Sequence, residues 1–349
     1  AGTARYAYGG GFIVNGALTG SITDCIFVGN SASAFKDWDT SYAYGGGFYV
    51  NGNLTGNVSG CSFAGNSLSA SSPHNNGHAY GGGFYVKDIL TGNISSCRFT
   101  DNSTGVDGYA YGGGFLIGTL NGTVTGCDFT ENTAHAGDAR GGGFYCEKTL
   151  TGDIKDSIFT GNIAKTSGAA FRTQGSFTGN ISDSGFYENA ANIAVYFNST
   201  LKGSIKNCDF INGETGSASD AVYVHGDLDG TIKNCSFSDF ARNAVCLANN
   251  SGTEGRIRSC LFVAPETLGE VSGWAINTNQ NTVISNNTIV GPGLGAAPLP
   301  PKASAIYIGF NTQAENGKIF NNIVVDTQCA IHVDAGVDMP IKYNLFDNV

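Results

Sequence analysis

Charged residues are scarce in this sequence. Lysine, arginine, aspartate and glutamate make up 13% of the 349 residues, about half the usual share. Methionine occurs once and proline seven times, and no apolar run reaches the roughly 18 residues that a membrane-spanning helix needs. The net charge of −10 disfavours a nucleic acid as partner, because binding to phosphates requires clustered lysine and arginine.

Glycine is abundant instead, with 52 residues, and it recurs within a repeated phrase. Residues 42–66 read YAYGGGFYVNGNLTGNVSGCSFAGN, and related phrases begin near Tyr6, His78, Tyr109 and Ala139. The period of roughly 25 to 36 residues is typical of a solenoid. Each phrase holds three short segments with strand-like alternation, separated by residues that favour turns. We therefore predict an all-β fold, a single-stranded parallel β-helix of about a dozen coils, right-handed by the rule for parallel crossovers.

One domain is expected over residues 1–349, because a solenoid core grows along one axis and no linker divides the sequence. The start at Ala1 rather than methionine fits removal of a leader or propeptide, or a trimmed chain. The segments after the third strand are longest in the first two coils, at Ser31–Ser41 and Ser67–Gly77. We expect these segments to be loops that stack at one corner and form a lateral surface.

Alternation along the strands predicts which side chains face the core. In the first strand of a coil, Phe48 and Val50 are expected inside and Tyr49 outside. In the third strand, the pattern Cys-x-Phe-x-x-Asn places cysteine and phenylalanine inside. The resulting cysteine ladder contains Cys25, Cys61, Cys97, Cys127, Cys208, Cys235 and Cys260. We interpret it as buried, reduced core filler, since stacked thiols suit neither disulfides nor a converging metal site; a redox or metal role is the alternative.

The asparagine of the same pattern forms a second column, at a turn. Stacked asparagine amides can hydrogen bond along a column, as they do in cross-β ladders. A structural role is therefore predicted for Asn30, Asn66, Asn102, Asn132, Asn162 and Asn189.

Two outward-facing columns are unusually rich in tyrosine. The column on the first strand contains Tyr49, Tyr85, Tyr145, Tyr196, Tyr223 and Tyr307, with Ile13, Leu116, Arg172, Cys246, Ala275 and His332 in the other coils. The second column precedes the glycines and contains Tyr8, Tyr44, Tyr80 and Tyr111. A contiguous exposed apolar stripe predicts a ligand site or an interface. Aromatic stacking that merely stabilises a sheet is the alternative.

The sequence predicts no catalytic residue, cofactor or metal site. Glycoside hydrolysis needs two carboxylates that face one groove. The candidate carboxylates are instead scattered around turns and outward positions near the third strand, at Asp24, Asp128, Asp156, Asp183 and Asp209. We expect a non-enzymatic protein, with a polysaccharide-active enzyme as the alternative.

The phrases GGGF and FxxN resemble the repeats of the polymorphic outer membrane proteins of the Chlamydia type, which alternate GGA plus an aliphatic residue with FxxN. Glycine replaces the alanine here, as in Gly45-Gly46-Gly47-Phe48, and the resemblance covers roughly residues 5–190. The FxxN phrase occurs at Phe27–Asn30, Phe63–Asn66, Phe99–Asn102, Phe129–Asn132, Phe159–Asn162 and Phe186–Asn189. The resemblance implies a secreted, surface-displayed β-helix, often an adhesin.

These observations predict a structural or adhesive protein located outside the cell or on its outer surface. Both ends of the sequence read like coils without a polar cap, which suits head-to-tail association into a filament. The residues expected at those ends are Tyr6, Phe12, Leu345 and Phe346. The expected partners are a second copy of the chain, a ligand on a host surface or a polysaccharide. The alternative function is a carbohydrate-binding or polysaccharide-active β-helix.

Overall fold

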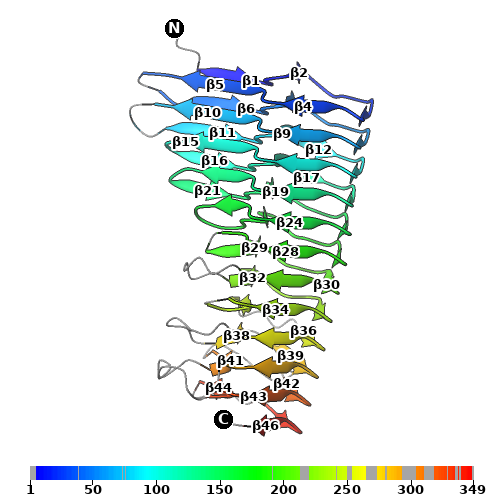
Figure 1. The fold of residues 1–349 in the computed structure, drawn as a ribbon, viewed down its shortest axis with the longest axis vertical. Helices are drawn as coiled ribbons and strands as arrows, with labels where there is room; N and C mark the ends of the chain where they lie inside the picture. The colour runs from blue at the N-terminus through cyan, green and yellow to red at the C-terminus, as the bar shows by residue number, and fades with distance from the viewer. Residues whose placement is uncertain are drawn as a thin grey trace. The chain divides into compact units, whose positions relative to one another are not determined.

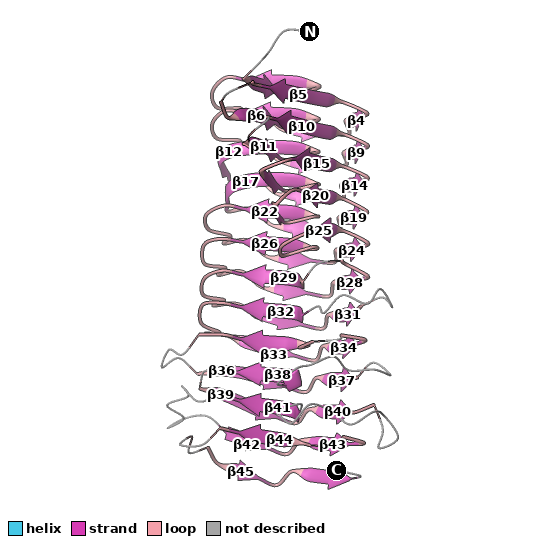
Figure 2. Ribbon diagram, turned by 90° about the vertical axis from the view of Figure 1, so that its left-hand side faces the viewer, coloured by secondary structure: helices cyan, strands magenta, loops and turns pink. Residues whose placement is uncertain are grey.

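The computed structural model describes residues 5–347 apart from 38, 73, 75, 191, 213–219, 241, 250–253, 265–272, 280, 293–303, 310–317, 328, 335, 336 and 338. These described residues form parallel strands and no helix (Figure 2). They group into two compact units, Ala1–Gly175 with Glu188–Ala194 (unit 1) and Ser176–Tyr187 with Val195–Val349 (unit 2). Within each unit the strands stack as successive coils (Figure 1), so the parallel β-helix is confirmed; one domain over residues 1–349 stays a prediction.

Unit 1 contains the three strands per coil that the sequence predicts. Sheet I holds the first strands, β2 (Phe12–Val14), β7 (Phe48–Val50), β12 (Phe84–Leu90), β17 (Phe115–Leu120), β22 (Phe144–Cys146) and β26 (Phe171–Thr173). Sheet II holds β3 (Ile22–Thr23), β8 (Val58–Ser59), β13 (Ile94–Ser95), β18 (Val124–Thr125) and β23 (Ile154–Lys155). Sheet III holds β4 (Ile26–Val28), β9 (Ser62–Ala64), β14 (Arg98–Thr100), β19 (Asp128–Thr130) and β24 (Ile158–Thr160).

Unit 1 also contains two further sheets. The prediction of loops at Ser31–Ser41 and Ser67–Gly77 was wrong, because sheet IV lies there, and sheet V was not predicted. Sheet IV is formed by β5 (Ser31–Phe35), β10 (Ser67–Ser71), β15 (Ser103–Val106), β20 (Thr133–His135) and β25 (Ile163–Ala164). Sheet V is formed by β1 (Tyr6–Tyr8), β6 (Ser41–Tyr44), β11 (Gly77–Tyr80), β16 (Tyr109–Tyr111) and β21 (Asp138–Arg140). The side chains between sheets IV and V are small: Ala34 and Ala70 of sheet IV pack in one cluster with Ala43 and Ala79 of sheet V. Because alanines fill the space between them, the two sheets lie close together and bring sheet V beside sheet I.

Unit 2 has three strands per coil, again named sheets I, II and III within that unit. Sheet I holds β32 (Asp220–Val224), β35 (Val245–Leu247), β38 (Gly273–Thr278), β41 (Ser304–Ile308) and β44 (Ile331–Val333). Of β29 (Ile193–Phe197), the residues from Val195 on belong to unit 2. Sheet II holds β27 (Ile181–Ser182), β30 (Ser204–Lys206), β33 (Thr231–Lys233), β36 (Gly255–Arg258), β39 (Thr282–Ser285), β42 (Lys318–Phe320) and β45 (Ile341–Lys342). Sheet III holds β28 (Gly185–Tyr187), β31 (Asp209–Ile211), β34 (Ser236–Ser238), β37 (Leu261–Val263), β40 (Thr288–Val290), β43 (Ile323–Val325) and β46 (Leu345–Asp347).

The core of unit 1 is built from two ladders of stacked phenylalanines. In sheet I, neighbouring rings from Phe12 to Phe171 lie 4.7–5.0 Å apart, centroid to centroid. In sheet III, the rings from Phe27 to Phe159 lie 4.5–4.9 Å apart. The spacing matches the distance between hydrogen-bonded strands, so in-register stacking places each ring on the equivalent ring of the next coil. The predicted inward positions of Phe48 and Val50 are confirmed, since both are fully buried.

The asparagine ladder is present as predicted. From Asn30 to Asn189, each side-chain Nδ2 donates to the Oδ1 of the next asparagine at 2.8–3.0 Å. The inner members also donate to a phenylalanine carbonyl, as Asn102 does to Phe63 at 2.8 Å. Each buried amide therefore has partners on both sides, which removes the cost of burying it.

Six members of the cysteine ladder are buried, as predicted, whereas Cys25 in the first coil is only partly buried. Each buried thiol donates to the carbonyl two residues earlier at 3.2–3.4 Å, in Cys61, Cys97, Cys127, Cys208, Cys235 and Cys260. The last coils of unit 2 replace cysteine with asparagine, where Asn287 donates to Asn322 and Asn322 to Asn344. One predicted register was wrong. Asn277, not Ala275, pairs with Cys246, since Val245, Cys246 and Leu247 pair in register with Ile276, Asn277 and Thr278.

Candidate functional site

The tyrosines of sheet V form a stacked column in unit 1. Tyr8, Tyr44, Tyr80 and Tyr111 pair in register on β1, β6, β11 and β16. Their ring centroids lie 5.2 Å (Tyr8–Tyr44), 5.5 Å (Tyr44–Tyr80) and 5.5 Å (Tyr80–Tyr111) apart. The first three rings are stacked and Tyr111 is tilted by 44° against Tyr80, so much of the ring surface lies against neighbouring rings.

The tyrosines on the outer face of sheet I lie beneath that column. Tyr49, Tyr85 and Tyr145 are only 4%, 8% and 3% exposed, although they point away from the phenylalanine core. Tyr44 contacts Tyr49 at 5.4 Å between ring centroids, and Tyr111 contacts Tyr145 at 5.0 Å. The predicted exposure of these three tyrosines was therefore wrong, because sheet V turns back over them at the glycine corner, whereas Ile13 in the same column is 40% exposed.

A groove runs where the two columns meet. It encloses about 470 Å³ and is lined by Tyr8, Ile13, Asn15, Tyr42, Tyr44, Tyr49, Asn51, Tyr80, Tyr85, Lys87, Tyr111, Leu116 and Glu147. We call this set the tyrosine groove. The structure thus brings together six of the ten predicted interface tyrosines in one cavity: Tyr8, Tyr44, Tyr49, Tyr80, Tyr85 and Tyr111.

The polar residues of the tyrosine groove were not among the predicted site residues. Asn51 Oδ1 accepts hydrogen bonds from the Tyr49 hydroxyl at 3.0 Å and from Lys87 Nζ at 2.9 Å. Glu147 is the one carboxylate among the described lining residues. Asn51 lies two residues after Tyr49, so strand alternation places both on the outer face. The same period could have identified Asn15, Lys87 and Glu147 from the sequence.

Burial raises the pKa values of several tyrosine hydroxyls in the groove. It raises the pKa of Tyr49 to about 12, and it also raises the pKa values of Tyr44, Tyr80 and Tyr85. Burial lowers the pKa of His78, whose Nδ1 lies 2.8 Å from the Tyr80 hydroxyl. At neutral pH these tyrosines can therefore both donate and accept hydrogen bonds.

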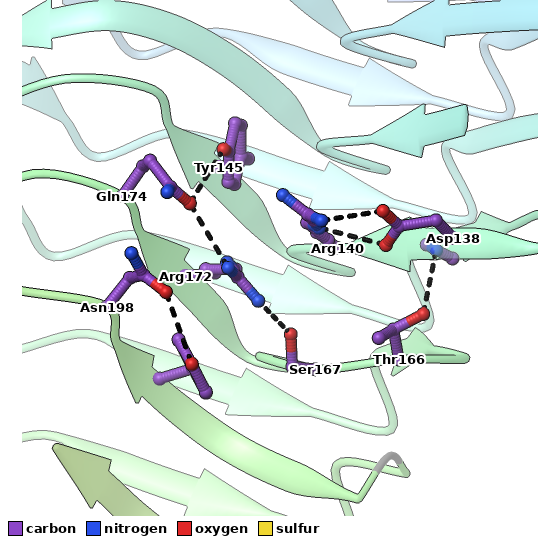
Figure 3. Close-up of polar contacts among 10 residues, drawn as sticks. Asp138, Arg140, Tyr145, Thr166, Ser167, Arg172, Gln174 and Asn198 are labelled. Carbon is purple, nitrogen blue, oxygen red and sulfur yellow. Dashed lines mark hydrogen bonds and ion pairs between the residues drawn. The ribbon is translucent and has the colours of Figure 1, made fainter. Parts of the chain in front are cut away.

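Arginines follow the tyrosines in both columns, and Figure 3 shows Arg140 and Arg172 with their polar partners. Arg140 follows Tyr111 in sheet V, stacks over its ring at 5.2 Å, and forms a two-pronged ion pair with Asp138 at 2.8 and 2.6 Å. Arg172 follows Tyr145 in sheet I, is nearly buried, and donates to Ser167 Oγ and to Gln174 Oε1 at 3.1 Å. In the coils that follow the tyrosines, both columns therefore continue with arginines, and these arginines already bind other side chains of the protein.

The other four predicted tyrosines do not line the groove, and three of them lie in unit 2. Tyr196 and Tyr223 stack at 5.2 Å between centroids and are half-buried. Tyr307 donates to Asp334 Oδ2 at 2.7 Å and stacks on His332. Tyr145 lies below Tyr111 without lining the cavity. Six of the ten predicted tyrosines therefore line the groove, and the other four contact neighbouring rings without lining it.

The predicted end residues are exposed to different degrees. Tyr6 is 43% exposed, Leu345 58% and Phe346 44%, whereas Phe12 is partly buried against Phe48. In the part of the chain that the structure describes, no three His, Cys, Asp or Glu side chains converge on a possible metal position. Nor do the described residues include a helix that could cross a membrane.

Comparison with known proteins identifies the fold family. The family described as a right-handed β-helix region matches residues 167–346. The chain belongs to the right-handed β-helix family. The predicted handedness is thereby confirmed. A solved structure that resembles the chain is a tailspike protein mutant of E. coli bacteriophage HK620 in complex with a pentasaccharide, with 11% identity, a TM-score of 0.32, and coverage of 94% of this chain and 72% of that chain. No relative was found among curated proteins.

Proposed function

We propose that this β-helix is a non-enzymatic adhesive protein of the extracellular space or the outer cell surface, and that its tyrosine groove binds a saccharide. The observation that carries the proposal is the groove itself, with a volume of about 470 Å³ and seven tyrosines among its lining residues. Pockets of this size typically accommodate small ligands and combine apolar walls with a few fixed polar groups. The resemblance to polymorphic outer membrane protein repeats supports the surface location.

The chemistry of the lining suits a polyhydroxylated ligand. Tyrosine hydroxyls, which keep their protons at neutral pH, can pair with sugar hydroxyls as donor or as acceptor. Lys87 Nζ donates a hydrogen bond to Asn51 Oδ1 at 2.9 Å, so both polar side chains lie at the same part of the groove. Tyr8 at the open end of the column is 42% exposed, so its ring can also contact the apolar face of a sugar.

The same lining supports binding without hydrolysis. Glycoside hydrolysis uses two carboxyl groups, about 5–9 Å apart, on either side of the scissile bond. Glu147 is the one carboxylate among the described residues that line the groove. A bound saccharide would therefore be held and not cleaved.

Binding of the purified chain to an array of oligosaccharides tests the proposal. We expect Tyr44→Ala to weaken binding of the selected glycan roughly tenfold or more, or about 1.4 kcal/mol, because Tyr44 contacts Tyr8, Tyr49 and Tyr80. Tyr196→Ala is the matched control, since Tyr196 also stacks on a neighbouring tyrosine but does not line the groove. Equal losses in both variants, cleavage of the glycan, or no binding across the array would contradict the proposal.

Head-to-tail self-association is a second candidate function. The observation that favours it is the apolar surface of the last described coil, where Leu345 is 58% and Phe346 44% exposed. A further coil, from the same chain or from a second copy, would cover these side chains. Sedimentation over a range of concentrations tests the filament. Loss of large species in Leu345→Lys would support it, and a monomer at all concentrations would exclude it for this chain.

A further inference from the structure

Positive charge is concentrated on sheet II of unit 2. Strands β30, β33, β36, β39, β42 and β45 contain no aspartate or glutamate. They carry six of the chain's 18 lysines and arginines, namely Lys206, Lys233, Arg256, Arg258, Lys318 and Lys342. In a chain with a net charge of −10, such a concentration on one face requires an explanation.

Three of these cations form a ladder. Lys206 pairs in register with Lys233, and Lys233 pairs with Arg258. The preceding isoleucine in each strand is fully buried, so alternation directs all three charges to the outer face. Neighbouring strands are about 4.8 Å apart, and like charges directly opposite each other destabilise a sheet. The ladder therefore stores repulsion that an anionic ligand would relieve.

Protein carboxylates compensate this ladder only weakly. Arg256, on the flanking column, is paired with Glu254 at 2.8 Å. Within the described residues, no carboxylate lies within ion-pair distance of Lys206, Lys233 or Arg258. Lys206 helps to lower the pKa of Asp183, but hydrogen bonds from Asn207 and Ser182 do so more strongly.

We propose that the cationic ladder Lys206–Lys233–Arg258 binds a linear acidic polysaccharide. Its charges repeat at the strand spacing along one line, which suits a chain with one carboxylate or sulfate on each successive sugar. Double-stranded DNA carries one charge per roughly 1.7 Å of helix axis, a far denser spacing than that of the ladder. The ladder lies in unit 2 and the tyrosine groove in unit 1, so either binding site can fail without the other.

The test uses labelled polygalacturonate as probe, with fully methyl-esterified polygalacturonan as its uncharged counterpart. We expect the chain to bind the acidic form, and binding to fall as ionic strength rises from about 0.01 M to about 0.15 M. The triple variant Lys206→Gln, Lys233→Gln, Arg258→Gln should bind roughly tenfold more weakly. The matched control neutralises three unit 1 lysines, with Lys36→Gln, Lys148→Gln and Lys165→Gln, and should bind like the parent chain.

Each alternative outcome overturns the proposal. Equal weakening in both triple variants would show a response to net charge alone. Equal binding of the esterified polymer would show that charge is not recognised, and tighter binding of single-stranded DNA or of anionic vesicles would assign the ladder to another partner. If the triple variant does not give the parent's unfolding curve, Lys233→Gln alone replaces it, with Lys148→Gln as its control.

Discussion

The middle glycine of the Gly-Gly-Gly corner has no room for a side chain, and Gly46→Val tests this directly. A Cβ atom at Gly46 would lie 2.0 Å from the carbonyl oxygen of Gly82 in the next coil and 3.2 Å from Asn66 Cβ. The same contact, at 2.2–2.4 Å, recurs at Gly10, Gly82 and Gly113. The clash is with backbone that cannot rotate away, because the N–H groups of Gly46 and Gly47 bond to Gly81 and Gly83 at 3.0 and 2.6 Å.

The magnitude follows from these contacts. Overpacking of a filled site costs about 1–3 kcal/mol, and weakening one or two backbone hydrogen bonds at the corner adds about 1 kcal/mol each. Replacing glycine restricts the unfolded chain, which offsets about 0.4–1 kcal/mol. We therefore expect Gly46→Val to lower the free energy of unfolding by about 2–4 kcal/mol.

Urea unfolding followed by circular dichroism measures this change. The control is Gly20→Val, because no heavy atom lies within 4 Å of the Cβ position at Gly20, so its free energy of unfolding should change by about 0.5 kcal/mol or less. An unchanged midpoint for Gly46→Val, or equal changes in the two variants, would refute the steric account of the corner.

Three further predictions concern buried polar groups. Asn102→Ala should cost about 2–4 kcal/mol of unfolding free energy, measured by the same urea assay, because Asn102 donates to Phe63 and its ladder neighbours lose a partner. Eight of the ten cysteines are buried, so a thiol reagent at neutral pH should modify most of them only after denaturation. Rapid modification of the native protein, or a low count of free thiols in denaturant, would contradict the buried, reduced ladder. Burial raises the pKa of Asp220, although Asn243 donates to its carboxylate. The folded state therefore holds this proton more tightly than the unfolded state, and its contribution to stability is present in acid and lost as pH rises through the folded pKa. Between about pH 4 and pH 7, the free energy of unfolding should therefore fall more steeply in the parent chain than in Asp220→Asn. Parallel pH profiles of the two proteins would contradict this prediction.

The sequence by itself determined the coil, the inward columns and the ladders. In-register stacking gives every equivalent residue the same surroundings in successive coils. A periodic pattern such as Cys-x-Phe-x-x-Asn therefore predicts Phe63 and Asn66 as reliably as it predicts Phe99 and Asn102. The asparagine ladder could be predicted because its partners are copies of itself, one coil away, and no long-range packing has to be known.

Only the tertiary structure decided what covers the outer faces. Alternation correctly directs Tyr49 away from the phenylalanine core, but it does not record that sheet V folds back over sheet I and buries this residue beneath Tyr44. That arrangement depends on the angle of the glycine corner and on the alanine packing between sheets IV and V, and both are contacts between different strands of a coil. The tyrosine groove exists because two separate columns meet across that corner, and no repeat within a single column can predict such a meeting.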